Sequence, residues 1–138
     1  MGLHVTPARN GMAEAYLVAA EQAGEKERSG WLRKAGRACQ VALKQGAIFR
    51  PGLPEAMRLQ GRYEWVRGRH SHAKQWWQRS LRETEAMGLP YDEGMLYLEM
   101  GKRLGERAHL EKAAEIFAAI GAEYDLAKAR GALERMKR

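Results

Sequence analysis

The sequence of 138 residues has little of what strands and active sites are built from. Valine and isoleucine together occur 7 times, whereas alanine occurs 22 times. Strands favour β-branched side chains and helices favour alanine, leucine, arginine, lysine and glutamate, so the composition predicts an all-α protein. Asparagine occurs once, aspartate and threonine twice and serine three times. This scarcity argues against a hydrolase or a metal enzyme, and we expect a non-enzymatic protein without cofactor or metal ion.

Cysteine is nearly absent as well, because Cys39 is the only one. A lone cysteine forms no internal disulfide, which favours a reducing compartment, and at a position with apolar neighbours we expect it to be a small core residue. The sequence has no apolar run of the roughly 20 residues that a membrane span needs, and the first ten residues lack the apolar centre of a signal peptide. We therefore expect a cytoplasmic protein with no membrane partner.

Proline and glycine divide the chain into short helical segments. Thr6 followed by Pro7 is typical of a helix start, Ser29 is predicted to cap the second helix, and glycines such as Gly88 and Gly121 are typical of helix ends. The apolar residues between these points recur at steps of three and four. We expect about seven helices, at residues 7–24, 29–49, 53–68, 71–87, 90–105, 108–120 and 123–138.

The second half of the chain contains an internal repeat. Three pairs of positions are each separated by 40 residues: Gly61 and Gly101, Ala73 and Ala113, and Trp77 and Phe117. A glycine inside a helix costs about 1 kcal/mol relative to alanine and is retained where a neighbouring helix comes close. We expect the alanine of the partner helix to make that close contact, and the aromatic residue to fill the space one turn further on.

These positions resemble the tetratricopeptide repeat, whose signature has a bulky residue and a glycine in the first helix and alanine, an aromatic residue and a second small residue in the second. The matching residues are Met57, Gly61, Ala73, Trp77 and Ser80 in one repeat and Tyr97, Gly101, Leu104, Ala113 and Phe117 in the next. The resemblance implies an all-α stack of antiparallel helical hairpins, an α-solenoid. It would form one domain over residues 1–138, with repeat units at 6–50, 53–88 and 89–121 and a final helix at 122–138.

Several short segments also resemble the helical-repeat regions of large bacterial signalling ATPases and transcriptional regulators. The matching segments are residues 63–77, 88–91 and 116–122. This second resemblance implies that the chain is a piece of a longer protein, with a structural or oligomerisation role as an alternative to binding.

Charge is distributed unevenly along the chain. Residues 28–82 contain thirteen basic and two acidic residues, whereas residues 83–138 contain nine basic and eleven acidic ones. Such an excess favours an acidic partner, either a protein or peptide or a nucleic acid. The neighbouring Trp76 and Trp77 would suit single-stranded nucleic acid, but Trp77 occupies the core position of the repeat and we expect both rings to pack.

The resemblance also implies where a partner would bind, because the first helices of tetratricopeptide repeats line a concave groove. Steps of four, three and four residues place Arg58, Arg62, Trp65 and Arg69 on one face, and Lys102 holds a similar place on a later helix. The asparagines of the carboxylate clamp known in that family are absent here. We therefore expect a general basic groove for an acidic or amphipathic segment, with nucleic-acid binding through residues 28–82 and a homo-oligomer as the alternatives.

Overall fold

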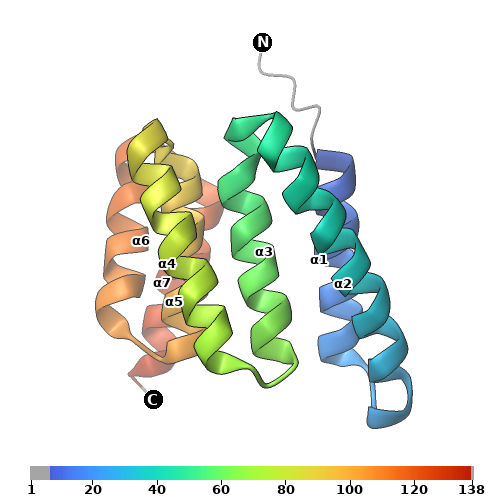
Figure 1. Cartoon of the computed structure of the whole chain (residues 1–138). Coiled ribbons are helices and arrows are strands. Elements are labelled where there is room, and N and C mark those ends of the chain that lie inside the picture. The colour runs from blue at the N-terminus through green and yellow to red at the C-terminus, as the bar shows by residue number, and fades with distance from the viewer. Residues whose placement is uncertain (1–6, 138) are drawn as a thin grey trace. The chain divides into compact units, whose positions relative to one another are not determined.

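A computed structural model describes residues 7–137 of the chain, and this part consists of helices joined by short turns (Figure 1). The residues at the two ends, among them the predicted cap Thr6, lie outside the described residues. The elements are α1 (Pro7–Gln22), α2 (Glu25–Ile48), the 3₁₀ turn η1 (Arg50–Gly52), α3 (Leu53–Val66), α4 (His70–Met87), α5 (Pro90–Leu104), α6 (Arg107–Ile120) and α7 (Glu123–Met136). Within residues 7–137 there are seven α-helices and no strand, which confirms the all-α prediction and the helix count.

The helix ends follow local chemistry at most positions. Gly88, Gly105 and Gly121 have φ values of 63°, 67° and 73°, and this left-handed conformation is the one that glycine supplies after a helix. Proline lies in the first turn of α3 and α5, where the missing N–H costs nothing. The glycine and proline signals therefore gave the ends of these helices correctly.

The start of α2 differs from the prediction that Ser29 caps this helix. The helix begins at Glu25, and the extended Gly24 precedes it with its carbonyl oxygen accepting hydrogen bonds from the N–H groups of Glu27 and Arg28. Glu25 and Glu27 place negative charge in the first turn, where the helix dipole favours it. Ser29 is consequently an exposed residue inside the helix.

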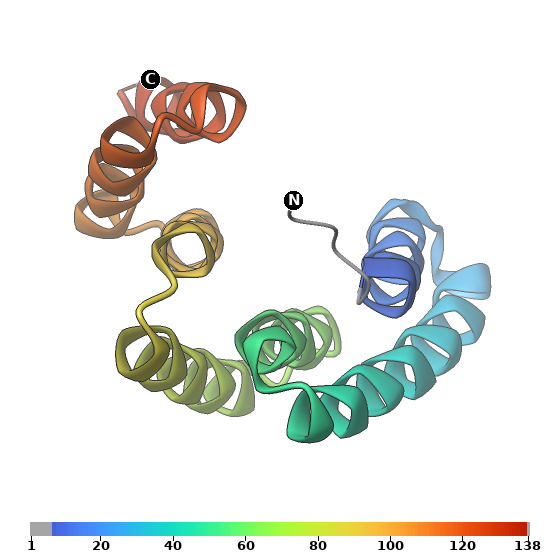
Figure 2. The ribbon, with the colours of Figure 1, turned by 90° about the horizontal axis from the view of Figure 1, so that it is seen from above.

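The described chain divides into two compact units, Met1–Ser80 and Leu81–Arg138, and the division falls inside α4. We call them the N-terminal and the C-terminal unit. The predicted repeat unit 53–88 contains α3 and the whole of α4, whereas the observed division falls inside α4. The single domain over residues 1–138 stays a prediction. Figure 2 shows α1, α2 and α3 lying one beside the next in the first unit, and α5, α6 and α7 doing so in the second.

Small side chains make the core of the N-terminal unit. Ala35 and Cys39 of α2 are completely buried with Leu17 of α1 and Leu59 of α3, and together with Ala13 they form one apolar cluster. Because the α2 residues at this interface are small, α2 lies close to both of its neighbours. The corresponding cluster of the C-terminal unit consists of Leu98, Leu110, Ala113, Phe117, Ala129 and Ala132.

Gly61 and Gly101 are close-packing positions inside their helices. A Cβ atom at Gly61 would lie 2.6 Å from Cδ1 of Trp77, and one at Gly101 would lie 2.6 Å from Cδ2 of Leu110. The nearest atoms at these two glycines therefore belong to Trp77 and Leu110, and close contacts of Ala73 and Ala113 stay a prediction. The large side chain lies directly over the helix backbone because the glycine leaves room for it.

Candidate functional site

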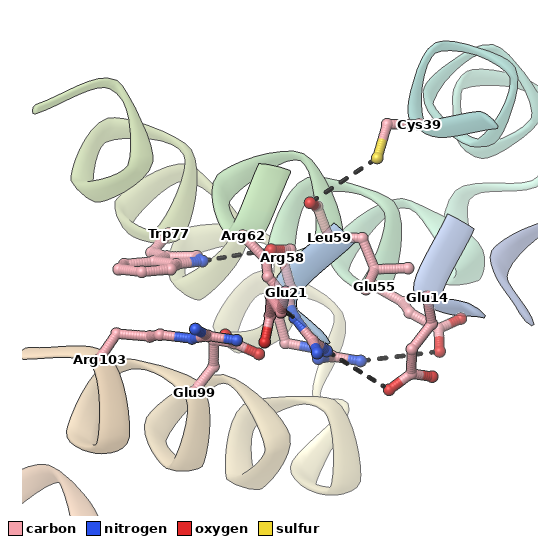
Figure 3. A network of polar contacts seen from close by, with 10 residues as sticks. All are labelled: Glu14, Glu21, Cys39, Glu55, Arg58, Leu59, Arg62, Trp77, Glu99 and Arg103. Carbon is pink, nitrogen blue, oxygen red and sulfur yellow. Dashed lines mark hydrogen bonds and ion pairs between the residues drawn. The ribbon is translucent and has the colours of Figure 1, made fainter. Parts of the chain in front are cut away.

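Two of the predicted groove residues, Arg58 and Arg62, have little exposed surface. Arg58 on α3 is 5% exposed and its guanidinium lies 3.8 Å from Glu55, one turn earlier. The backbone carbonyl of the same residue accepts a hydrogen bond from Nε1 of the buried Trp77, at 3.2 Å (Figure 3). Arg58 thus takes part in joining α3 to α4, and its side chain presents little surface to a partner.

Arg62 is held by two carboxylates of α1. Its Nε donates a hydrogen bond to Glu21 at 2.8 Å and its Nη1 lies 3.7 Å from Glu14, as Figure 3 shows. The side chain of Arg62 is 12% exposed and that of Glu21 is 26% exposed, so this ion pair is partly removed from water. The charge of Arg62 is compensated within the unit, which gives this residue a role in fixing α3 against α1.

Trp65 and Arg69 lie at the turn that joins α3 to α4. The indole of Trp65 stacks on the imidazole of His70 with ring centres 3.7 Å apart and an angle of 11° between the planes. Its ring is also 5.7 Å from the ring of Trp77, so Trp65 packs at the end of the hairpin. Arg69 is exposed, and its backbone N–H donates a hydrogen bond to the carbonyl of Glu64. The predicted groove residues on and beside α3 therefore lie in different environments. Arg58 and Arg62 are largely buried, the ring of Trp65 is packed, and Arg69 is exposed.

Lys102 belongs to the C-terminal unit. Its side chain is exposed on α5, where it borders a depression that is also lined by Leu110, Arg135 and Met136. The depression contains two cations and no carboxylate among its described lining residues. Lys102 and the four residues near α3 stay a predicted set of partner contacts.

The N-terminal unit nonetheless carries a large excess of exposed positive charge. Between residues 28 and 80 every exposed charged residue is basic, because Glu55 is half-buried, with 36% of its side chain exposed, and Glu64 is buried. The exposed cations come mainly from α2 and α4 and from the turns beside α3. They are Arg28, Arg33, Lys34, Arg37, Lys44, Arg50, Arg67, Arg69, Lys74 and Arg79.

Two members of this set also have a structural role. The guanidinium of Arg28 donates hydrogen bonds to the carbonyl oxygens of Ala20 and Ala23, each at 3.3 Å, and so caps the end of α1. Arg67 lies 3.4 Å from Oε1 of Glu64. Glu64 lies three residues before Arg67, a spacing that is visible in the sequence, whereas the carbonyl groups that Arg28 binds belong to the end of the preceding helix and its turn.

Three of the cations lie over aromatic rings of the same unit. Lys34 is 4.9 Å from the ring centre of Trp31, Arg79 is 4.5 Å from that of Trp76, and Arg67 is 5.0 Å from that of Tyr63. Such contacts are worth about 0.5–1 kcal/mol at exposed sites. They hold the cations near the surface in defined positions. Trp77 is completely buried, which confirms that its ring packs, whereas Trp76 is half-buried.

Cys39 is an unreactive thiol in this setting. It is completely buried, its Sγ–H donates a weak hydrogen bond to the carbonyl of Leu59 at 3.7 Å, and burial together with the charge of Glu64 raises its pKa to about 12. The thiolate, which is the nucleophile, is therefore scarce at neutral pH. The prediction that Cys39 is a small core residue is confirmed.

Further features of the described residues bear on the class of the protein. In residues 7–137 there is no group of three or more histidine, cysteine, aspartate or glutamate side chains that could hold a metal ion. Among the helices of this part, none combines the length and the apolar character needed to cross a membrane. Comparison of the chain with protein-family models, curated proteins and solved structures finds no match.

Proposed function

We propose that this chain is a non-enzymatic protein-interaction module, a tetratricopeptide-like stack of helical hairpins whose basic N-terminal unit holds an acidic or amphipathic segment of a partner protein. One observation carries the proposal: every exposed charged residue between residues 28 and 80 is basic. A surface of one sign attracts an oppositely charged partner and accelerates the encounter with it. Three carboxylates of the unit, Glu55, Glu21 and Glu64, are engaged by Arg58, Arg62 and Arg67, and the exposed Glu25 and Glu27 lie just before this surface, in the first turn of α2.

The proposal is tested by titrating a fluorescent glutamate-rich peptide into the whole chain and following its anisotropy. We expect binding that weakens as salt is added, because the contacts are between exposed charges. A peptide of the same length with lysine in place of glutamate is the control and should not bind. If both peptides bind equally, or neither binds, the proposed function is wrong.

The groove residues are tested in the same titration with the double variant Arg69→Glu/Lys102→Glu. Both side chains are exposed, so the fold should persist, whereas reversal at Arg58 or Arg62 would place an acid inside the unit. A loss of affinity relative to the wild type supports the groove. Unchanged affinity would show that the predicted groove does not bind the peptide, and the exposed cations of α2 and α4 would then be the binding surface.

Nucleic-acid binding through residues 28–82 is the second candidate, favoured by the cations that lie over Trp31 and Trp76. Basic and aromatic side chains together bind single strands through phosphate contacts and base stacking. Binding driven by several phosphate contacts falls by orders of magnitude between about 50 and 200 mM salt. A short oligothymidine that binds more tightly than the acidic peptide, with this salt dependence, would favour the second candidate.

A further inference from the structure

The exposed side of α2 carries a regular seam that the groove prediction did not use. Five exposed residues follow one another at steps of three, four, three and four: Lys34, Arg37, Val41, Lys44 and Ile48. At a rise of 1.5 Å per residue the seam is about 21 Å long. The opposite side of the same helix, with Ala35, Cys39 and Ala42, is buried in the core of the unit. We call these five residues the α2 seam.

The α2 seam contains three cations and two apolar residues, and the apolar residues lie in its C-terminal half. Val41 is 39% exposed and Ile48 is 81% exposed, and Phe49, which follows directly, is 49% exposed. Single exposed apolar residues are ordinary, but these two lie seven residues apart on one stripe and continue into an exposed aromatic ring. A repeat of 3.5 residues is the spacing at which one helix receives the side chains of another.

From this pattern we infer that the α2 seam binds an amphipathic helix of the partner protein that is apolar on one stripe and acidic beside it. The inference rests on the proposed function and names the partner segment and its place. Apolar side chains of that helix would cover Val41 and Ile48, and its carboxylates would face Lys34, Arg37 and Lys44. A helix of about four turns matches the length of the seam.

Charge decides against two other occupants of the α2 seam. A second copy placed seam to seam would bring the three cations of each copy within a Debye length, about 8 Å, of those of the other, which is unfavourable. A nucleic acid would engage cations wherever they are exposed, including Lys74 and Arg79 on α4, and would gain nothing from Ile48. An acidic amphipathic helix is the occupant that uses both the charges and the apolar residues.

The experiment uses a fluorescent helical peptide of about 21 residues with leucine at every a position and glutamate at d, e and g. We expect wild-type protein to bind it and a peptide of scrambled order to bind about tenfold more weakly, because the scrambled peptide presents no apolar stripe. Lys34→Glu/Lys44→Glu should weaken binding of the ordered peptide by about tenfold or more. Val41→Ser/Ile48→Ser should weaken it about fivefold, through loss of the apolar contact.

The matched control is Lys74→Glu/Arg79→Glu, which makes the same change of charge on α4, outside the α2 seam. It should weaken binding by less than about threefold, and circular dichroism should show that all variants remain helical. The inference about the α2 seam is wrong if the control variant weakens binding as much as Lys34→Glu/Lys44→Glu, or if the scrambled peptide binds as well as the ordered one. The proposed function stands in either case. If no glutamate-rich peptide binds at all, both are wrong, and tighter binding of oligothymidine or dimerisation in light scattering identifies the other occupant.

Discussion

At the scale of single residues, Arg62 shows that a cation of a basic protein can be largely buried when carboxylates lie beside it. Its guanidinium reaches Glu21 and Glu14 on α1, and 12% of its side chain is exposed. Ion pairs that are partly withdrawn from water matter most when one partner is removed, because the remaining group loses its compensation. Arg62 is therefore expected to contribute to stability and Arg33, an exposed cation of the same unit, to contribute little.

The first prediction follows from this difference. Arg62→Ala should lower the free energy of unfolding of the N-terminal unit by about 1–2 kcal/mol, because a 2.8 Å charged hydrogen bond and the packing of the side chain are lost. Arg33→Ala should change it by less than about 0.5 kcal/mol. Urea unfolding followed by tryptophan fluorescence measures both, and equal effects of the two substitutions would contradict the structural role of Arg62.

Cys39 gives a second prediction, which has two parts, and the first part concerns the reactivity of the thiol. With a pKa raised to about 12, the buried thiol should resist alkylation by iodoacetamide at pH 8 in the folded protein and react rapidly in urea. The rate of modification is followed by mass spectrometry over time. Rapid modification of the folded chain would show that the thiol is accessible, against its complete burial.

The same shift predicts how stability depends on pH. Between the ordinary pKa of 9.0 and about 12 the folded state keeps the Cys39 proton that the unfolded state loses, so the thiol's contribution to stability is complete below pH 9 and falls above it. The limiting slope is about 1.4 kcal/mol per pH unit. Urea unfolding between pH 8 and 10.5 should therefore show a steeper loss for the wild type than for Cys39→Ala, and parallel curves would contradict the shift.

At the scale of the elements, glycines set the distance between helices. The indole of Trp77 is fully buried over Gly61, and a Cβ atom there would lie 2.6 Å from its Cδ1. Gly30 on α2 has no atom within 4 Å of the place where its Cβ would be. The same substitution should therefore have opposite effects at the two glycines.

The third prediction compares Gly61→Ala with Gly30→Ala. The first should destabilise the N-terminal unit by about 1–3 kcal/mol, because the indole must move within a packed core. The second should stabilise it by about 0.5–1 kcal/mol, because alanine favours the helix and nothing opposes it. Thermal unfolding by circular dichroism measures both, and a stabilising Gly61→Ala would show that the close contact does not constrain the helices.

The helices could be predicted from the sequence because their signals are local, whereas the contacts between helices could not. Gly61 and Gly101 were found through their separation of 40 residues, but Gly94, which lies against Phe117, has no counterpart at that period. Arg62 was assigned to a binding face because its helical phase matched that of Arg58. Its partners come from α1, about forty residues earlier, and only the tertiary fold brings them together.

At the scale of the whole molecule, the basic charge belongs to one unit. Residues 1–80 contain 14 basic and 6 acidic residues, and residues 81–138 contain 10 and 11. Some exposed cations of the C-terminal unit have carboxylates beside them: Arg107 lies 3.6 Å from Glu111 and Lys112 lies 3.2 Å from Glu115. Unbalanced charge destabilises a compact state through self-repulsion, so the N-terminal unit alone should carry this penalty.

The distribution of tryptophan makes this penalty measurable in the intact chain. All four tryptophans, Trp31, Trp65, Trp76 and Trp77, lie within residues 1–80, so tryptophan fluorescence reports the N-terminal unit and circular dichroism reports helices of both units. Sodium chloride screens repulsion between exposed charges, while the partly buried Arg62–Glu21 pair is less affected.

The fourth prediction is that raising sodium chloride from about 20 to 500 mM increases the stability of the N-terminal unit by up to about 1 kcal/mol in urea unfolding followed by fluorescence. Arg37→Gln/Lys44→Gln should be more stable than the wild type at low salt and should show less of this increase, since two repelling charges are already gone. Arg107→Gln/Lys112→Gln, an equal reduction of charge among paired residues, should leave the fluorescence transition unchanged. If the stability of the N-terminal unit instead falls with salt in all three proteins, ion pairs stabilise the unit. Repulsion between its exposed cations would then make no measurable contribution to its free energy of unfolding.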